Sequence, residues 1–156
     1  MYALLAKSPL FADLVTHPLA LAFAEAELGQ SCLLSALLAI NLHPGETAQP
    51  WHFDDGGAKM PRPRPALGIS AFWAIDDTTE LNGSTEVIPG SHLWDEQAIE
   101  GAAKPADFTS RRTPNNERDP GSRSGAVKMM MLSGSLAVAK GTLWHRGGAN
   151  LSDRRV

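Results

Sequence analysis

The most informative part of this chain for its fold and function is the segment Gln49-Pro50-Trp51-His52-Phe53-Asp54-Asp55-Gly56. On an extended backbone, the side chains of residues i and i+2 point to the same side. His52 and Asp54 can therefore reach one cation together, while Phe53 points the other way into the protein. Taken alone, a His-x-Asp pattern is more often a hydrogen-bonded pair at the surface, so a metal site needs support from the rest of the chain.

A third ligand is offered by the segment Trp144-His145-Arg146-Gly147-Gly148, in which His145 follows Asp54 by 91 positions. Glycines follow both ligand segments, and they allow ligand-bearing backbone to turn tightly at the end of a strand. Two imidazoles and one carboxylate on one face of an octahedron leave three positions open, which is the arrangement typical of non-haem iron(II) oxygenases. The alternative for His145 is a core histidine packed beside Trp144.

Composition narrows the class of protein. A length of 156 residues suits one domain over 1–156, and 43% hydrophobic with 20% charged residues is typical of a soluble globular protein. A net charge of −3 does not provide the basic field that a nucleic-acid partner needs. The single cysteine, Cys32, excludes an internal disulfide and a thiolate metal cage. No stretch reaches the roughly 18 apolar residues of a membrane span, so we expect a cytoplasmic protein.

The pattern of apolar residues predicts short helices followed by short strands. Helical spacing runs from about Pro9 to Leu28, divided at Pro18 and ended near Gly29. Leu33 to Leu42 predicts a buried strand, although its Ala and Leu content leaves a helix open. Further strands are predicted over 66–75, 86–88, 127–132 and 135–139. This order favours an α+β protein, mainly β, built around a barrel or a double-sheet sandwich.

Three separated blocks of the sequence resemble the phytanoyl-CoA dioxygenase family, in order and in approximate spacing. They are Gln49-Pro50-Trp51-His52-Phe53-Asp54, Asn82-Gly83-Ser84-Thr85-Glu86-Val87-Ile88-Pro89-Gly90-Ser91-His92, and His145-Arg146-Gly147-Gly148-Ala149-Asn150-Leu151-Ser152. The resemblance implies a double-stranded β-helix (a jelly roll, cupin-like) with N-terminal helices. It also implies iron(II) at His52, Asp54 and His145, with molecular oxygen and 2-oxoglutarate as co-substrates. The reaction it implies is hydroxylation of a small molecule, with 2-oxoglutarate decarboxylated to succinate and CO2.

The resemblance also implies an arginine about ten residues after the distal histidine, where it holds the far carboxylate of 2-oxoglutarate. A guanidinium suits this role because its planar fork binds a carboxylate bidentately. We favour Arg155 over Arg154, since a strand alternates sides and only one of the two can face the pocket. Ser152 can add a hydroxyl to the same carboxylate. For Asn41, contact with the co-substrate and formation of a strand-end turn are equally good interpretations.

Several other polar residues receive weaker predictions. Asp55 should face away from the metal if the strand is regular, and His92 should pack the turn in which it lies rather than bind metal. Asp76 and Asp77 are predicted to be loop residues. A less favoured interpretation is that one of them hydrogen-bonds a metal ligand and holds it in place. Residues 59–65 can edge the pocket. The polar loop 99–125 can form a lid that attracts an anionic substrate, although a solvated, mobile loop is the favoured interpretation. Its four arginines are Arg111, Arg112, Arg118 and Arg123.

The alternatives to a hydroxylase are a halogenase, an inactive fragment or binding module, and a zinc hydrolase. Halogenases related to the family have a small residue in place of the carboxylate, so Asp54 predicts hydroxylation rather than halogenation. The family usually carries more chain on both sides of this segment, and an incomplete barrel that keeps the metal motif as an inactive fragment or binding module is the second interpretation. A zinc hydrolase with His52, Asp54, His145 and water as ligands is the third.

Overall fold

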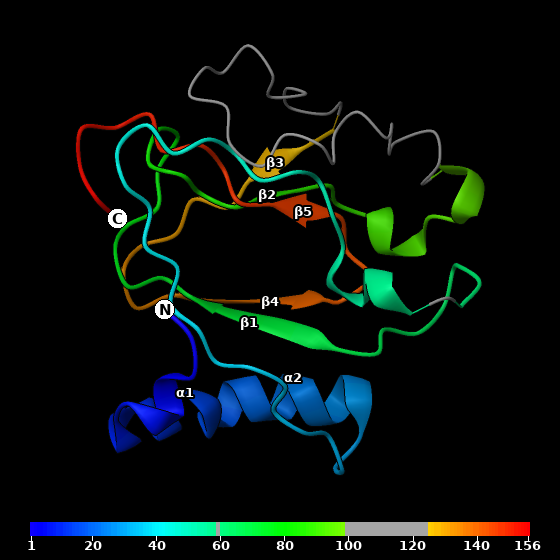
Figure 1. The fold of residues 1–156 in the computed structure, drawn as a ribbon. Coiled ribbons are helices and arrows are strands. Elements are labelled where there is room, and N and C mark those ends of the chain that lie inside the picture. Colours follow the sequence, from blue (N-terminus) through cyan, green and yellow to red (C-terminus); the bar gives the residue numbers. More distant parts are fainter. Residues whose placement is uncertain (59, 99–124) are drawn as a thin grey trace.

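The N-terminal part of the chain forms short helices (Figure 1). The computed structural model describes residues 1–58, 60–98 and 125–156. Helices α1 (Ala12–Val15) and α2 (Pro18–Leu28) follow two 3-10 turns, η1 (Leu4–Ala6) and η2 (Pro9–Phe11). Pro18 stands at the first position of α2, where the His17 ring nitrogen Nδ1 accepts the Leu19 N–H at 3.3 Å. The predicted division of the helical segment at Pro18 is therefore confirmed, and Gly29 ends α2 with a φ of 88°.

Within the described residues, five short strands form two antiparallel sheets that face each other (Figure 1). One sheet pairs β1 (Ile69–Trp73) with β4 (Leu136–Lys140). The other has the order β3-β2-β5 and consists of β3 (Val127–Lys128), β2 (Glu86–Val87) and β5 (His145–Arg146). Two further 3-10 turns, η3 (Asp54–Gly57) and η4 (Ser91–Leu93), lie at the same end of the sheets.

Helix α2 covers the outer face of the β1–β4 sheet, which leaves the inner face turned toward β5. On the outer face, the Trp73 ring meets the ring of His17 edge-on at 5.0 Å, and Lys140 pairs with Glu27 at 2.8 Å. Side chains alternate along a strand, so Ser70 and Phe72 point inward. The Phe72 ring accordingly contacts the His145 ring, with 6.0 Å between their centroids.

A small aromatic core lies beside the segments that carry the candidate ligands. Trp51 and Trp144 are 1% and 2% exposed, and with Ile88 they form the buried cluster. Phe53, Trp94 and Ala126 pack against it. Each buried tryptophan directly precedes a candidate histidine ligand, so the core holds the backbone of both ligand segments.

The predicted buried strand over Leu33 to Leu42 is wrong. This segment has no regular strand pairing, and most of its large side chains are exposed, with Leu33 at 91% and Ile40 at 63%. Its backbone is held at isolated points: Leu37 accepts from Leu4, Ala39 pairs with Met1, and Leu42 pairs with Val156. An apolar run of Leu and Ala cannot by itself show whether a neighbouring strand exists to pair with it.

The other predicted strands exist, although they are shorter or shifted. The strand predicted over 66–75 is limited to Ile69–Trp73, and the one over 127–132 is limited to Val127–Lys128. The predicted loop 99–125 with its four arginines, like Lys59, falls almost wholly outside the described residues. Within the described residues, no helix has the length and apolar character required to cross a bilayer.

Candidate metal centre

A short stretch of antiparallel pairing brings the two candidate histidine ligands together. His52 and His145 lie opposite each other, with the His52 N–H donated to the His145 carbonyl at 3.0 Å and the reverse bond at 2.9 Å. Side chains of directly opposed residues share one face of the ladder. The two imidazole rings therefore lie side by side, with 4.5 Å between their centroids.

The backbone sets which ring nitrogen each histidine offers to a ligand. Nδ1 of His52 lies 2.9 Å from the Pro50 carbonyl oxygen, and Nδ1 of His145 lies 3.0 Å from the Leu143 carbonyl oxygen. A carbonyl can only accept, so Nδ1 must carry the proton in both rings. This tautomer leaves the lone pair on Nε2, the arrangement in which a histidine binds a metal.

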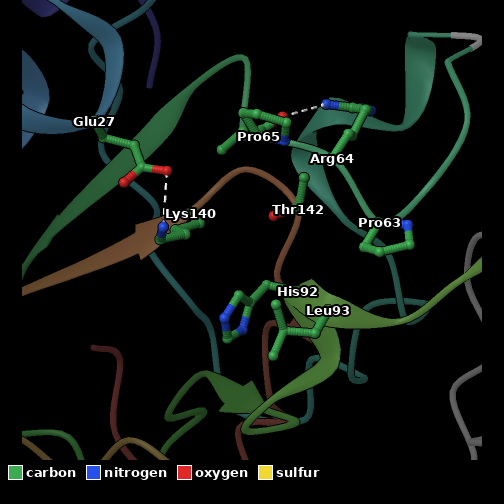
Figure 2. Close-up of a pocket in the computed structure, with 9 residues that line it drawn as sticks. Glu27, Pro63, Arg64, Pro65, His92, Leu93, Lys140 and Thr142 are labelled. Carbon is green, nitrogen blue, oxygen red and sulfur yellow. Dashed lines mark hydrogen bonds and ion pairs between the residues drawn. The ribbon is translucent and has the colours of Figure 1, made fainter.

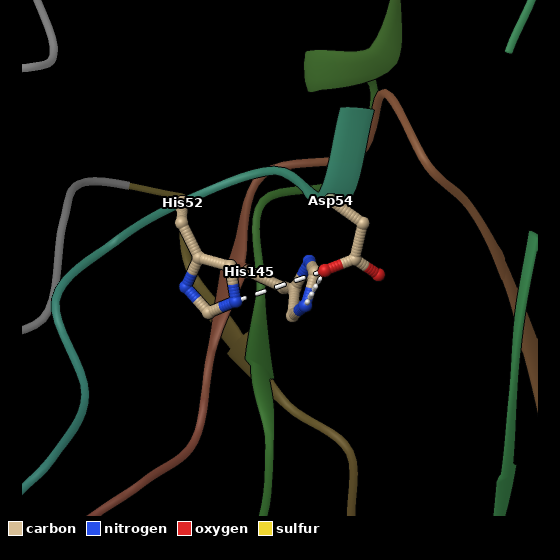
Figure 3. Close-up of side chains that lie close together, drawn as sticks. All are labelled: His52, Asp54 and His145. Carbon is tan, nitrogen blue, oxygen red and sulfur yellow. Dashed lines mark ion pairs between the residues drawn. The ribbon is translucent and has the colours of Figure 1, made fainter. Parts of the chain in front are cut away.

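Asp54 completes the cluster from the start of η3. The preceding residue, Phe53, is extended (φ −135°, ψ 141°), so Asp54 returns to the side of His52. The Oδ1 atom of Asp54 lies 3.9 Å from Nε2 of His52 and 3.7 Å from Nε2 of His145. One ligand atom from each of the three residues lies within 4.8 Å of the other two, and Figure 3 shows the three side chains converging.

The three side chains of the cluster differ in burial, and this affects the pKa of His145. The His145 side chain is 8% exposed, whereas those of His52 and Asp54 are 36% and 41% exposed. Burial is the largest effect and lowers the pKa of His145; the hydrogen bond to the Leu143 carbonyl is the next largest and raises it, and smaller effects follow from His52, which lowers it, and Asp54, which raises it. The net lowering of the pKa favours the neutral imidazole, the form that binds a metal. The centre opens to solvent on the side of His52 and Asp54.

Phe53, between the two ligands of the first segment, points into the protein as predicted. Its ring packs against Trp144 at 5.6 Å, and the guanidinium of Arg62 lies over it at 4.6 Å. Arg62 also donates to three backbone carbonyls, those of Trp94, Ser91 and Thr142. Arg62 thus ties η4 and the β4–β5 turn to the residue between the ligands.

Asp55 faces away from the cluster of His52, Asp54 and His145, as predicted. The predicted reason, a regular strand, is wrong. The chain enters the 3-10 turn η3 at this point instead of continuing as a regular strand. The Asp55 carboxylate pairs with Arg64 at 3.1 Å and accepts the Leu67 N–H at 2.8 Å, with both charged side chains about 5% exposed. Sequence reasoning did not identify this buried pair, because two charges nine positions apart in a proline-rich segment carry no periodic signal.

A second buried ion pair lies on the opposite face of β5 and was also missed. The Arg146 Nε donates to Glu86 Oε2 at 2.9 Å, and the Arg146 guanidinium lies 5.0 Å from the centre of the Trp51 ring. The side chains of Arg146 and Glu86 are 2% and 8% exposed. Glu86 and Arg146 are direct partners in the β2–β5 ladder, and only the register of the ladder could have shown this.

The four candidates for 2-oxoglutarate binding lie near the C-terminus and its pairing partner. Leu42 and Val156 exchange backbone hydrogen bonds at 2.7 and 3.0 Å, which makes Asn41 and Arg155 diagonal neighbours on one face of this antiparallel pairing. Asn41, Arg154 and Arg155 are exposed. The Ser152 hydroxyl is used within its own turn, where it bonds Asn150 Oδ1 at 2.7 Å. No contact recorded among the described residues links these four to the metal cluster, and their role stays a prediction.

The remaining candidates lie away from the cluster. Asp76 is exposed, and Asp77 Oδ1 accepts the Ser133 N–H at 2.7 Å, so both act as loop residues in the described structure. His92 lines a surface hollow of about 350 Å³ together with Lys140, Thr142 and Pro63 (Figure 2). This hollow contains none of the three candidate ligands.

The sequence profile of the family described as Phytanoyl-CoA dioxygenase (PhyH) matches residues 2–156. The chain belongs to the phytanoyl-CoA dioxygenase family. Among curated relatives, Dioxygenase trt7 from Aspergillus terreus is 33% identical over 162 aligned residues, covering 98% of this chain and 49% of the fungal protein. Dioxygenase andF from Emericella variicolor is 34% identical, covering 72% of this chain and 34% of that protein. The chain thus spans half or less of the length of these curated relatives.

Solved structures show the same fold at lower identity. The non-heme monooxygenase ThoJ, described as a nickel complex, has a TM-score of 0.61 and 21% identity, covering 92% of this chain and 49% of ThoJ. EvdO2 from Micromonospora carbonacea var. aurantiaca, described as complexed with 2-oxoglutarate, has a TM-score of 0.60 and 19% identity, covering 99% of this chain and 62% of EvdO2. The family predicted from three blocks of sequence is confirmed.

In this member of the phytanoyl-CoA dioxygenase family, the second block runs alongside the third and supports it. Ile88 donates its N–H to the Trp144 carbonyl at 3.0 Å, and the Ser91 hydroxyl accepts the Trp144 N–H at 2.9 Å. Asn82 pairs with Asn150 at the other end of the two blocks. The block without ligands therefore fixes the backbone that carries His145.

Proposed function

We propose that residues 1–156 form a single iron(II)- and 2-oxoglutarate-dependent dioxygenase domain that hydroxylates a small molecule. The observation that carries the proposal is the convergence of three donor atoms within 4.8 Å, with both histidines held in the tautomer that presents Nε2. The matching family profile and the named dioxygenase relatives support the same class of reaction. The proposed barrel is a double-stranded β-helix, in line with the two facing sheets.

The donor set fits iron(II). Two imidazole nitrogens and one carboxylate oxygen form the facial triad of non-haem iron oxygenases, and iron(II) is the metal we propose for His52, Asp54 and His145. With 2-oxoglutarate and O2, a bound iron(II) supplies the oxidation that yields succinate, CO2 and a hydroxylated product. The residues of the chain orient the ligands: the Pro50 and Leu143 carbonyls fix the imidazoles, and η3 fixes Asp54. Because Asp54 provides a carboxylate where halogenases have a small residue, we propose hydroxylation rather than halogenation.

The 2-oxoglutarate site is proposed at the C-terminus, with Arg155 holding the far carboxylate. The pairing of Leu42 with Val156 supports this, because it brings Arg155 near Asn41, a second candidate contact. EvdO2, a protein of the same fold, is described with 2-oxoglutarate bound. Arg154 is the alternative cation, and the use of Ser152 within its turn makes Ser152 the weakest of the four candidates.

Replacement of the two arginines distinguishes the candidates. Loss of a charged hydrogen-bond donor costs about 1.5–3 kcal/mol, so Arg155→Ala is expected to weaken 2-oxoglutarate binding roughly 10- to 100-fold. Arg154→Ala is the matched control, since it removes the same charge one position earlier and should change binding by less than about twofold. The measurement is calorimetric titration of 2-oxoglutarate into metal-loaded protein. Equal effects of the two substitutions would contradict the assignment of Arg155.

The proposed function is tested by anaerobic titration of the metal-free protein with iron(II) and 2-oxoglutarate, followed by visible absorption. We expect a weak metal-to-ligand charge-transfer band that requires both additions and disappears in Asp54→Ala. Oxygen should then convert 2-oxoglutarate into succinate. Absence of the band from folded protein would overturn the proposal in favour of an inactive domain that retains the motif. Tight zinc retention without oxygen-dependent succinate would favour a zinc hydrolase instead.

A further inference from the structure

Ser70 reaches the candidate metal centre from the opposite sheet. Its hydroxyl donates to Oδ2 of Asp54 at 2.5 Å. The other carboxylate oxygen, Oδ1, is the atom that faces Nε2 of both histidines, at 3.9 and 3.7 Å. The two oxygens of Asp54 are therefore in different surroundings: one faces the centre and the other is held by a hydroxyl.

The sheet fixes the position of Ser70. Ser70 lies opposite Ala139 in the β1–β4 pairing, the second of five consecutive residue pairs, so the ladder continues on both sides of it. It shares the inner face of β1 with Phe72, whose ring contacts His145. On the outer face, Trp73 is held by His17. The hydroxyl thus comes from a strand supported on both faces, and a group on a strand is placed more accurately than one on a loop.

Asp54 needs such a partner more than its neighbour does. The Asp54 side chain is 41% exposed, so packing leaves its carboxylate room to rotate. Asp55, by comparison, is buried and held by both Arg64 and the Leu67 N–H. The backbone of η3 places the Cα of Asp54, and the Ser70 hydroxyl sets the direction of its carboxylate.

We propose that Ser70 is a positioning residue that keeps Asp54 a one-oxygen ligand of the metal. A hydroxyl has one proton to donate, and here it engages Oδ2 on the side away from the histidines. A carboxylate that bound through both oxygens would occupy one of the three positions that the facial triad leaves open. Ser70 thereby preserves the positions needed by the co-substrate and oxygen. This inference rests on the proposed metal site.

The test uses cobalt(II) alone as the probe, titrated into the metal-free chain of residues 1–156 and followed through its visible d–d bands. The variants are Ser70→Ala, which removes the hydroxyl, and Ser70→Thr, which keeps a hydroxyl on a residue that favours strands. Ser133→Ala is the matched control, since that hydroxyl bonds only to the Ile75 carbonyl in an exposed turn among the recorded contacts. Circular dichroism checks that each variant is folded.

Loss of a group that orients a metal ligand typically weakens metal binding about 10- to 100-fold, and we expect Ser70→Ala to lose about tenfold. The shape of its d–d bands should also change, because the number of oxygen donors changes. Ser70→Thr and Ser133→Ala should resemble the unaltered chain. Unchanged cobalt(II) affinity and d–d bands in Ser70→Ala would overturn the role of Ser70 but not the metal site. The same holds if Ser70→Thr binds cobalt(II) as weakly as Ser70→Ala. Failure of the unaltered chain to bind cobalt(II) would overturn the metal site itself and this inference with it.

Discussion

At the scale of single residues, both histidines of the centre are fixed by the same local contact. In each case the ring nitrogen Nδ1 bonds the carbonyl oxygen two positions earlier in the chain, that of Pro50 for His52 and that of Leu143 for His145. Such a bond requires only the backbone of the same segment. The tautomer of each imidazole is thereby set before any metal arrives, and the cost of ordering the rings on metal binding is small.

Gly148, three positions after His145, marks where a single added methyl group should damage the site. A Cβ at this position would lie 2.4 Å from the carbonyl oxygen of Ser84, a backbone atom that cannot move cheaply. We expect Gly148→Ala to lower the free energy of unfolding by about 2–3 kcal/mol. Gly57→Ala is the control, since nothing lies within 4 Å of its Cβ, and it should stay within about 0.5 kcal/mol. Urea titrations of both variants measure this difference, and equal stabilities would contradict the expected clash.

At the scale of secondary-structure elements, the short ladder between β2 and β5 carries opposite chemistry on its two faces. His145 belongs to the face with the metal cluster, and its partner in the ladder is Val87. Arg146 and Glu86 belong to the other face, where both are buried. The two residues of β5 thus place a candidate ligand on one face and half of an ion pair on the other. The ion pair helps to hold the register of the β2–β5 ladder.

Breaking this pair should destabilise the ladder more than breaking a surface pair. Loss of a hydrogen bond between charged groups costs about 1.5–3 kcal/mol, so Glu86→Gln should lower the free energy of unfolding by about that amount. Glu80→Gln is the matched control: Glu80 pairs with Lys128 at 3.2 Å but its side chain is 66% exposed, and the change should stay below about 1 kcal/mol. Comparable losses in chemical denaturation would show that the buried Glu86 pair adds no more stability than the exposed Glu80 pair.

The three candidate ligands could be predicted from the sequence, because each lies in a short segment with a recognisable local pattern. The i, i+2 alternation at His52 and Asp54, and the recurrence of a histidine between Trp144 and glycines, identified the three residues that the structure brings together. The contacts that hold them could not be predicted in the same way. Ser70 and Asp54 are 16 positions apart, and Glu86 and Arg146 are 60 apart. Pairs of this kind follow from strand register, for which the sequence has no local signal.

At the scale of the whole molecule, a metal ion would join segments that are distant in the chain. His52 and Asp54 lie on one side of a 91-residue interval and His145 on the other. The structure places this junction between the two sheets, next to the aromatic core of Trp51 and Trp144. Metal binding should therefore stabilise the fold as a whole and not only the residues around the ion.

Metal-dependent stabilisation gives a test at this scale. A ligand at 100 times its Kd stabilises the native state by about 2.7 kcal/mol. For a chain of this length that corresponds to a rise in Tm of about 5–10 °C. Anaerobic thermal unfolding with iron(II) should show the rise in the unaltered chain and not in Asp54→Ala. An equal rise in both would place metal binding elsewhere on the protein.

The reciprocal backbone bonds between His52 and His145 also make the site sensitive to misalignment. If that pairing slipped by one residue, every side chain beyond it would exchange faces. The guanidinium of Arg146 would then stand beside His52, where the imidazole of His145 stands now, and a cation would repel any metal. Only the observed alignment of these two segments, whose histidines are 93 positions apart, brings the three candidate ligands together, so the ligand set depends on correct pairing of the chain.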